Sequence, residues 1–306
     1  MPRTALVCVN YDSSAHVSRL LDSLRGVDVA EIILWDNFSS EDERVRLAAI
    51  VEQHPNARLE FADDNLGFGP AVNRAIATVQ AEVDQYWVLN PDITVEVDTL
   101  ANLSRSAGEH DCAIISPLVL TGSGERIWYA GGDVVPPAGR TVHRMIGRER
   151  SAGALRGYSD VSFVTGAALL VKKDAWDTLG GFDERFFLYC EDADLSIRAE
   201  RLGLRMGVES TAVARHFEGG SSGGTPDAKS ATFYFYVQRN RLILYRQFVS
   251  RAQLLIGRGG VETLRLLVHP VLPISPGALG RLRASLSGVF AGIRGEVGPR
   301  SGRVTS

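Results

Sequence analysis

Short apolar runs alternate with segments of helical periodicity along the first half of the chain. The runs have the length of buried strands and cover residues 5–9, 31–35, 58–61, 86–89 and 112–116. Apolar residues recur at helical spacing between them, over residues 14–24, 41–53, 70–79 and 99–107. Strands that alternate with helices favour a mostly parallel sheet covered by helices on both faces. We therefore expect an α/β fold.

The pattern changes in the second half of the chain. Residues 121–158 are rich in Gly, Pro and Arg, which is typical of loops and hairpins over the edge of a site. Further strands are predicted over residues 161–171 and 205–214, and helices over residues 192–203 and 229–253. A Gly- and Ser-rich loop over residues 219–224 has the composition of a lid that folds over a ligand.

The last part of the chain has a different character. Two amphipathic stretches, residues 261–268 and 279–293, are separated by three prolines. We predict one α/β domain over residues 1–245 and a basic amphipathic helical extension over residues 246–306. The extension contains nine arginines and two acidic residues, although the whole chain has a net charge of −3. This asymmetry indicates contact with something anionic, such as a membrane surface; the alternative is that the extension packs on the domain.

Composition narrows the class of protein. A hydrophobic share of 45% and a charged share of 23% over 306 residues are ordinary for a globular protein, and the charge indicates no nucleic acid partner. No apolar run approaches the roughly 20 residues of a transmembrane helix, and no signal-peptide pattern opens the chain. Cys8, Cys112 and Cys190 have no metal-clip or disulfide spacing, which is consistent with a reducing cytosol. We expect a cytoplasmic protein, with peripheral contact at the inner face of the plasma membrane as a further option.

Polar residues follow the predicted strands at the point where each strand ends. They are Asn10, Asp36, Asn37, Asn65, Asn90 and Asp92. In an open α/β sheet, ligands bind at the carboxyl ends of the strands. Since all these loops meet at one edge of the sheet, the sequence predicts a shared ligand site there.

Three of the polar residues have side chains suited to a nucleotide or a metal. Asp92 lies just beyond a buried strand and could coordinate Mg²⁺ or Mn²⁺ together with substrate phosphates, or it could cap a helix near Val95. Asp36 could accept the imide N–H of uracil or thymine, or form an Asx turn or helix cap. His216 could bind the metal or a diphosphate, or have a structural role.

A glycine turn precedes the third predicted helix. Gly67-Phe68-Gly69 opens this helix and would allow close approach to phosphate or ribose, although a plain strand-to-helix turn is the alternative. The match to a dinucleotide fingerprint is weak, because Val72 occupies the third glycine position and the motif follows the third strand.

A dense acidic cluster over residues 180–195 contains five carboxylates among aromatic residues. Glu191 and Asp192 stand where a helix begins, so they could cap that helix through its dipole. In the functional interpretation Asp192 and Glu191 are the catalytic residues, and Asp192 is a general base that faces the acceptor, with its pKa shifted by apolar neighbours. Thr165 and Gly166 form a small-residue turn that could line the floor of the same pocket.

These segments together resemble glycosyltransferase family 2, and in particular its bacterial rhamnosyltransferase-like members. The matching positions run in family order and include Asn10-Tyr11, Asp36-Asn37-Phe38-Ser39, Asn65-Leu66-Gly67 with Asn73, Asn90-Pro91-Asp92, Thr165-Gly166-Ala167, Gly180-Gly181-Phe182-Asp183-Glu184, Glu191-Asp192-Ala193-Asp194, His216 and Arg239-Asn240. The resemblance implies a GT-A fold, a divalent cation and an inverting transfer. It assigns Asp36 to the base, Asp92 to the metal and Asp192 to the catalytic base.

Two positions depart from the family pattern. Asn90 replaces the first carboxylate of the Asp-x-Asp motif, which leaves one fewer negative ligand for the metal. Gln238-Arg239-Asn240 stands in the region where other members carry Gln-x-x-Arg-Trp.

The resulting hypothesis is an enzyme that moves a sugar, with rhamnose as one candidate, from a thymidine- or uridine-diphosphate donor to a hydroxyl. The acceptor would be a saccharide or a lipid-linked sugar in cell-surface polysaccharide or glycolipid synthesis. The main alternative is a catalytically decayed nucleotide-sugar binding module. A dehydrogenase is disfavoured because the first loop lacks glycines, and a pyrophosphorylase because the loop at Asn10 is neither glycine-rich nor basic.

Overall fold

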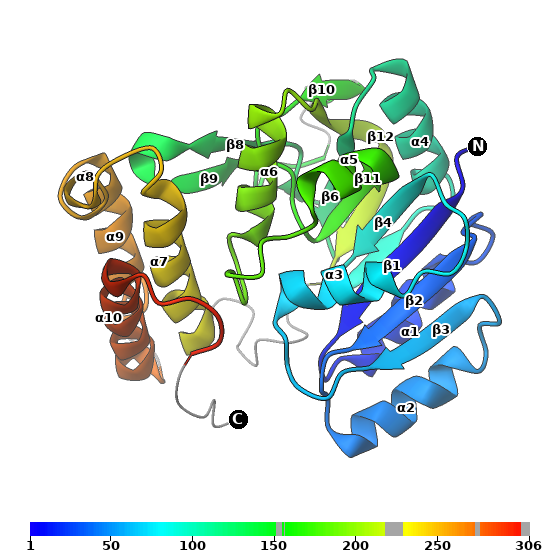
Figure 1. Ribbon diagram of the computed structural model, residues 1–306, viewed down its shortest axis with the longest axis horizontal. Coiled ribbons are helices and arrows are strands. Elements are labelled where there is room, and N and C mark those ends of the chain that lie inside the picture. Colours follow the sequence, from blue (N-terminus) through cyan, green and yellow to red (C-terminus); the bar gives the residue numbers. More distant parts are fainter. Residues whose placement is uncertain (151–154, 156, 218–228, 273–275, 301–306) are drawn as a thin grey trace.

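The computed structural model describes residues 1–150, 155, 157–217, 229–272 and 276–300 (Figure 1). Its centre is a ten-stranded mixed sheet. The strands are β1 (Thr4–Asn10), β2 (Glu31–Asp36), β3 (Ala57–Phe61), β4 (Gln85–Leu89), β5 (Ile93–Val95), β6 (Ile114–Thr121), β7 (Ile127–Tyr129), β10 (Tyr158–Asp160), β11 (Ala168–Lys172) and β12 (Met206–His216). A separate antiparallel pair consists of β8 (Gly132–Val135) and β9 (Arg140–His143), joined by a 3₁₀ turn, η1 (Pro136–Ala138).

The order of the main strands is β10-β12-β6-β11-β4-β1-β2-β3, with β5 paired to β12 and β7 paired to β6. Strands β4, β1, β2 and β3 are parallel neighbours, as are β12 and β6. The short β11 runs antiparallel between β4 and β6. Its amino end therefore lies beside the carboxyl end of β4, which brings the turn before β11 to the predicted site.

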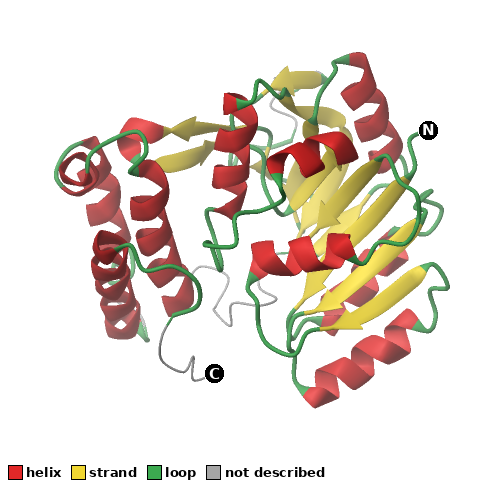
Figure 2. Ribbon diagram, viewed as in Figure 1, coloured by secondary structure: helices red, strands yellow, loops and turns green. Residues whose placement is uncertain are grey.

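Helices cover the sheet on both faces, and α3 and α5 lie in front of it in the view of Figure 2, with α1 behind. The helices of this part are α1 (Ser14–Ser23), α2 (Glu41–Val51), α3 (Phe68–Ala77), α4 (Thr99–Glu109), α5 (Lys173–Leu179) and α6 (Glu191–Arg201). The buried faces of the strands and helices form one continuous apolar core. The predicted α/β class is confirmed.

The secondary structure differs from the sequence-based expectation at three places in this part of the chain. Residues 161–171 are not one strand, because Val161–Ala167 form a buried irregular segment and only Ala168–Lys172 pair as β11. The segment is apolar because most of it is buried, and an apolar run of this length looks like a strand on the sequence although it does not pair as one. Helix α5 was not predicted. Ile93–Val95 is a strand, so Asp92 has no helix near Val95 to cap.

Four helices form a group at one end of the molecule (Figure 1). They are α7 (Ala231–Tyr245), α8 (Arg251–Leu255), α9 (Arg258–Val268) and α10 (Ala278–Arg294). The predicted continuous helix over residues 229–253 ends at Tyr245, and a Ser250–Gln253 capping box starts α8. Helix α10 lies against α7, where Gly288 and Gly292 face the backbone oxygens of Phe235 and Arg239. Among the described residues, no helix is both long and apolar enough to cross a membrane.

Candidate active site

The ends of β1 and β2 are joined by a buried polar network. Asn10 and Asp36 are register partners in the parallel pair, so their side chains meet at the sheet edge. The Asn10 amide donates to Asp36 Oδ1 at 3.1 Å, and both side chains are fully buried. Arg44 donates to Asp36 Oδ2 at 2.8 Å, and the backbone N–H of Ser39 donates to the same oxygen at 3.1 Å. The contact with Ser39 is a side-chain contact within the turn, as in the alternative role expected for Asp36 from the sequence.

A second network fixes the glycine turn. Asn37 donates to Asn65 Oδ1 at 3.0 Å and to the carbonyl of Gly67 at 3.1 Å, and it accepts from the N–H of Leu66 at 3.0 Å. Asn65 Oδ1 also accepts from the N–H of Gly67 at 2.9 Å. Asn37 is almost fully buried. These amides hold the loops after β2 and β3 to each other and shape the edge.

The glycine turn also touches the acidic cluster. Gly67 has φ of +84°, and a Cβ there would lie 2.0 Å from the carbonyl oxygen of Phe187. The N–H of Phe68 donates to that same oxygen at 2.9 Å. Further along α3, Asn73 exchanges two hydrogen bonds, each 2.9 Å, with the backbone of Phe182. Asn73 therefore connects α3 to the cluster rather than extending into open space.

Exposed aromatic rings border this edge, and the sequence reasoning did not assign them a role. Tyr11 is 39% exposed, Phe38 49% and Phe61 48%. Phe38 and Phe61 each lie within 5.5 Å of the Arg44 guanidinium. Flat apolar rings beside polar groups are surfaces on which a nucleobase can stack. The available signal was position, since Tyr11 and Phe38 directly follow Asn10 and Asn37.

The proposed metal ligands come together at the centre of the edge. Strand β5 pairs with the end of β12, which puts Ile93 opposite His216, and the N–H of Phe217 donates to the Asp92 carbonyl at 2.8 Å. His216 Nε2 lies 3.1 Å from Asp92 Oδ1. His216 is 8% exposed, and its Nδ1 is buried without a partner. The segments that carry these two side chains are more than a hundred residues apart in sequence.

Other groups surround this pair. Asn90 donates its backbone N–H to Ala167 at 2.9 Å, and its side-chain oxygen is buried without a partner. Burial, followed by the charge of Arg19, lowers the pKa of His16, and the nearby charge of Asp92 partly opposes this decrease. Arg19 contacts His16 at 3.2 Å. His16 and Arg19 were missed, because on the sequence they are ordinary polar positions of the first helix.

The carboxylates of the acidic cluster differ in environment. The N–H of Gly166 donates to Asp192 Oδ2 at 3.2 Å, and the N–H of Ala193 donates to Oδ1 at 2.8 Å. Burial raises the pKa of Asp192 above its usual value, and these two N–H groups partly oppose the rise. Burial, followed by the charge of Asp192, raises the pKa of Glu191 well above its usual value. Glu191 Oε2 is buried without a partner.

The turn before β11 lies against this carboxylate. A Cβ on Gly166 would lie 3.4 Å from the Asp192 Cβ, so a small residue is favoured there. Thr165 is buried and its hydroxyl accepts from the N–H of Ala167 at 3.3 Å. Because Ala167 also bonds Asn90, one short backbone path connects the Asp192 contact to the loop of Asp92.

Strained backbone precedes the helix that carries Asp192. Tyr189 and Cys190 have φ of 65° and 73°, a conformation that side chains other than glycine rarely adopt. Asn240 on α7 donates to the carbonyls of Leu188 and Tyr189 at 2.9 and 2.8 Å. Strain that persists at such a place indicates a functional constraint. Asn240, which the sequence matched only as part of Arg239-Asn240, thus bonds to the backbone of this strained turn.

The predicted lid over residues 219–224 lies outside the described residues. The described part of the chain also contains no group of three or more His, Cys, Asp or Glu side chains arranged to hold a metal.

Solved structures with the same architecture define the class. The fold matches that of Staphylococcus aureus TarS 1–349 in complex with UDP-GlcNAc, with a TM-score of 0.54, 15% identity, and 96% of this chain and 92% of that chain covered. It also matches GalNAc-T7 with UDP, GalNAc and Mn²⁺, with a TM-score of 0.63, 14% identity, and 94% and 55% covered. The chain has the GT-A fold.

The sequence comparison then gives the family. The sequence model of the family described as "Glycosyltransferase like family 2" matches residues 2–241, and the chain belongs to this family of glycosyltransferases. It is 29% identical over 266 residues to the N-acetylglucosaminyl-diphospho-decaprenol L-rhamnosyltransferase of Mycobacterium tuberculosis (strain ATCC 25618 / H37Rv), with 77% of this chain and 84% of the relative covered. It is 26% identical over 212 residues to the rhamnosyltransferase WbbL of Escherichia coli (strain K12), with 66% and 78% covered. The resemblance to rhamnosyltransferase-like members is confirmed.

Proposed function

We propose that this glycosyltransferase moves a sugar, rhamnose being the first candidate, from a thymidine- or uridine-diphosphate donor to a hydroxyl with inversion. The proposed acceptor is a saccharide or a lipid-linked sugar used in cell-surface polysaccharide or glycolipid synthesis. The observation that carries the proposal is the backbone path from Asp192 through Gly166 and Ala167 to the Asp92 loop. This path supports a site in which the half-buried Asp192 carboxylate acts near the groups suited to the diphosphate. The relatives that are named as rhamnosyltransferases support the choice of sugar.

The Asp92–His216 pair fits a divalent cation. Ligand atoms at adjacent positions around Mg²⁺ or Mn²⁺, each about 2.1 Å from the ion, are separated by about 3 Å. Asp92 Oδ1 and His216 Nε2 are 3.1 Å apart. Two protein ligands are few, but such ions often take the remaining ligands from substrate phosphates and water. Bound between Asp92 and His216, the cation would neutralise charge that develops on the departing diphosphate. Two structural neighbours that contain Mn²⁺ support a divalent cation, although not its particular ligands.

We assign the general base to Asp192. In the proposed step its carboxylate takes the proton of the acceptor hydroxyl as the hydroxyl oxygen attacks the anomeric carbon. The bond between that carbon and the diphosphate oxygen breaks, so one displacement inverts the configuration. A pKa raised by burial suits a base that works near neutral pH. Burial and the charge of Asp192 raise the pKa of Glu191 well above its usual value, which disfavours a second negative charge beside Asp192.

The donor nucleoside is assigned to the ends of β1, β2 and β3. We propose that the base stacks on Tyr11 or Phe38 and that the ribose and phosphates run past Asn65 and Gly67 towards Asp92. Asp36 remains our candidate for reading the base. Because its carboxylate is fully buried and bonded to Arg44, direct contact requires the turn at Phe38 to open. Cation–π contacts of Arg44 with Phe38 and Phe61 would break in the same movement.

A catalytically decayed binding module is the second candidate, and in such a module Asp192 would have no catalytic role. A module without catalysis has no need for a half-buried carboxylate with a raised pKa directly after a strained turn, since both features cost stability. The three groups Asp92, His216 and Asp192 occur together in a connected arrangement. This arrangement favours the enzyme.

Calorimetric titration of uridine and thymidine diphosphates, with and without Mn²⁺, tests the proposal. We expect binding of one of them to depend on Mn²⁺ and to be lost in Asp92→Ala. In Asp192→Asn we expect binding to persist and the rate of transfer to fall by about 10²- to 10⁴-fold. Metal-independent binding that survives Asp92→Ala would contradict the metal site, and full transfer by Asp192→Asn would contradict the base.

A further inference from the structure

The outward face of α10 contains apolar side chains that no described part of the chain covers. Small residues pack this helix against α7: Ala284, Ser285, Gly288, Ala291 and Gly292 are buried. A helix turns about 100° per residue, so positions 279, 286 and 290 lie on the opposite side. Leu279 is 59% exposed, Leu286 41% and Phe290 57%. The helix is therefore apolar on two sides, and only one of them serves the fold.

Helix α9 shows the same arrangement. Its buried side includes Thr263 and Leu266, which face the rest of the helical group. On the opposite side, Val261 is 72% exposed, Leu264 61% and Val268 38%. The two helices contact each other. We call these six outward residues of α9 and α10 the apolar face.

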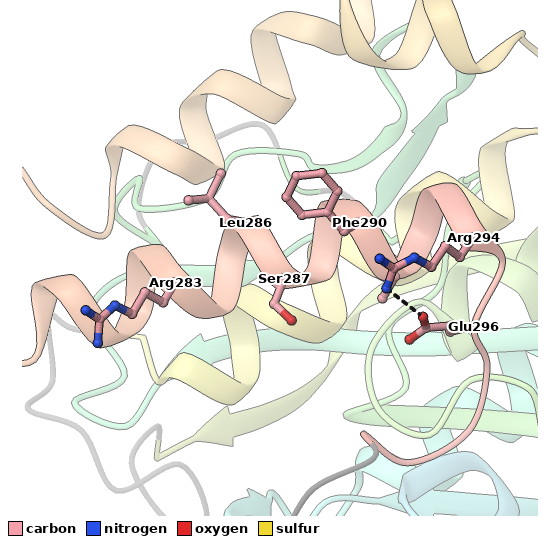
Figure 3. Close-up of a pocket in the computed structure, with 7 residues that line it drawn as sticks. Arg283, Leu286, Ser287, Phe290, Arg294 and Glu296 are labelled. Atoms are coloured by element: carbon pink, nitrogen blue, oxygen red, sulfur yellow. Dashed lines mark hydrogen bonds and ion pairs between the residues drawn. The ribbon is translucent and has the colours of Figure 1, made fainter.

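Arginines accompany the apolar face. Arg283 and Arg294 line a hollow of about 350 Å³ on α10 together with Leu286 and Phe290. Figure 3 shows Leu286 and Phe290 on the same side of the helix, with the two arginines at either end. Glu296 pairs with Arg294 at 3.4 Å. Glu262, the other acid of the described extension, is buried and paired with Arg265. The exposed charge around the face is thus mainly positive.

We propose that the apolar face binds the surface of an anionic lipid bilayer. Exposed Leu, Phe and Val insert at the boundary between headgroups and acyl chains, and arginines attract anionic headgroups. A second copy of the chain is a poorer occupant. In a symmetric dimer through this face, Arg283 and Arg294 would meet the same arginines of the other copy, and like charges disfavour that contact.

The inference deepens the proposed function, since a lipid-linked acceptor presents its hydroxyl at a membrane. The binding itself depends only on α9 and α10. Asp192→Asn should therefore bind vesicles as the unmodified chain does, so the two proposals can fail separately.

The test is flotation of the full chain with vesicles of phosphatidylglycerol and phosphatidylcholine, compared with phosphatidylcholine alone. We expect binding only to the anionic vesicles. The double change Leu286→Gln and Phe290→Gln should weaken it roughly tenfold or more. The change Arg283→Gln with Arg294→Gln should weaken it and reduce its dependence on salt. Val45→Gln, at a residue of α2 that is 67% exposed, is the matched control and should leave binding unchanged.

The proposal is overturned if the Leu286→Gln, Phe290→Gln variant binds the anionic vesicles as well as the unmodified chain does. It is also overturned if the unmodified chain does not bind them. A third contrary result would be a dimer of the unmodified chain, seen by light scattering, that becomes a monomer in the Leu286→Gln, Phe290→Gln variant. Because the changed side chains are exposed, the variants should keep the melting temperature of the parent, which separates loss of binding from loss of fold. Transfer to a short soluble acceptor should also be unchanged in both double variants.

Discussion

The two halves of the sheet edge use their buried polar groups in opposite ways. At the ends of β1, β2 and β3, Asn10, Asp36 and Asn37 bond to one another, to Arg44 and to nearby backbone. In the centre, polar atoms of Asn90 and His216 are buried without partners. Glu191 Oε2 is also unpartnered.

Buried polar groups in native proteins are nearly always paired, so unpaired ones need an explanation. The paired edge shapes a cradle that exists before any ligand binds. The centre retains hydrogen-bonding capacity on Asn90, His216 and Glu191 that a bound ligand could use. This difference is consistent with the proposal that the chemistry takes place at Asp92, His216 and Asp192 and that the nucleoside binds at the other half.

The largest expected effect is on catalysis at the centre. We expect Asp192→Asn to lower kcat by about 10²- to 10⁴-fold, because the amide can still accept from Gly166 but cannot take a proton. Donor affinity should be unchanged. Steady-state kinetics with donor titration measures both quantities.

Asp183→Asn is the control for that change. Asp183 belongs to the same acidic cluster but is already paired with the exposed Arg185, so kcat should stay within a few-fold of the parent. An equal loss in both variants would show that the cluster acts through its overall charge, and the contrast between the two halves would lose its catalytic meaning.

The second prediction concerns the contact between Gly67 and Phe187, which joins the two halves of the edge. In Gly67→Ala the new Cβ would collide with the Phe187 carbonyl, 2.0 Å away, at a backbone φ of +84°. We expect roughly ten- to a hundredfold loss in kcat/KM, with donor affinity reduced as well. Binding and kinetics of the purified variant provide the measurement.

Gly180→Ala separates strain from collision. Gly180 has φ of +70°, but a Cβ there meets nothing within 4 Å. This variant should lose stability through its backbone, by about 1 kcal/mol, and retain kcat/KM. If both variants lose activity equally, contact with Phe187 does not couple the halves.

The sequence was sufficient for the class, the family and the loops that make the edge. Strands with polar ends are local patterns, and parallel pairing brings those ends together without further information. The sequence could not show that Asn73 bonds to the backbone of Phe182, since that contact spans 109 residues. Nor could it show that Asp36 is fully enclosed by Arg44 and Asn10, because enclosure depends on the path of the next helix. Residues 161–171 were misjudged since burial, not pairing, makes them apolar.

The third prediction concerns the support of the centre. We expect Asn240→Ala to lower kcat about tenfold with little change in donor KM, because two carbonyls of the strained turn before Asp192 lose their donor. A purely structural role would lower the melting temperature and leave the kcat of the folded fraction unchanged. Asn240→Ser, which keeps a shorter donor, should recover part of the activity. Kinetics at a temperature well below melting distinguishes the two outcomes.

The smallest expected effect is a change in stability at Glu191, and its sign follows from the direction of the pKa shift. Burial raises the pKa of Glu191, so the folded chain holds this proton at pH values where the unfolded chain has lost it. Stability therefore falls as pH rises from the usual glutamate value to the raised one. Glu191→Gln keeps the shape of the protonated form and removes this dependence. We expect equal melting temperatures of variant and parent near pH 4, and an advantage of roughly 2–4 °C for the variant at pH 8. A parent that is more stable than the variant at pH 8 would show that the ionised Glu191 has a partner, and the centre would then resemble the paired edge.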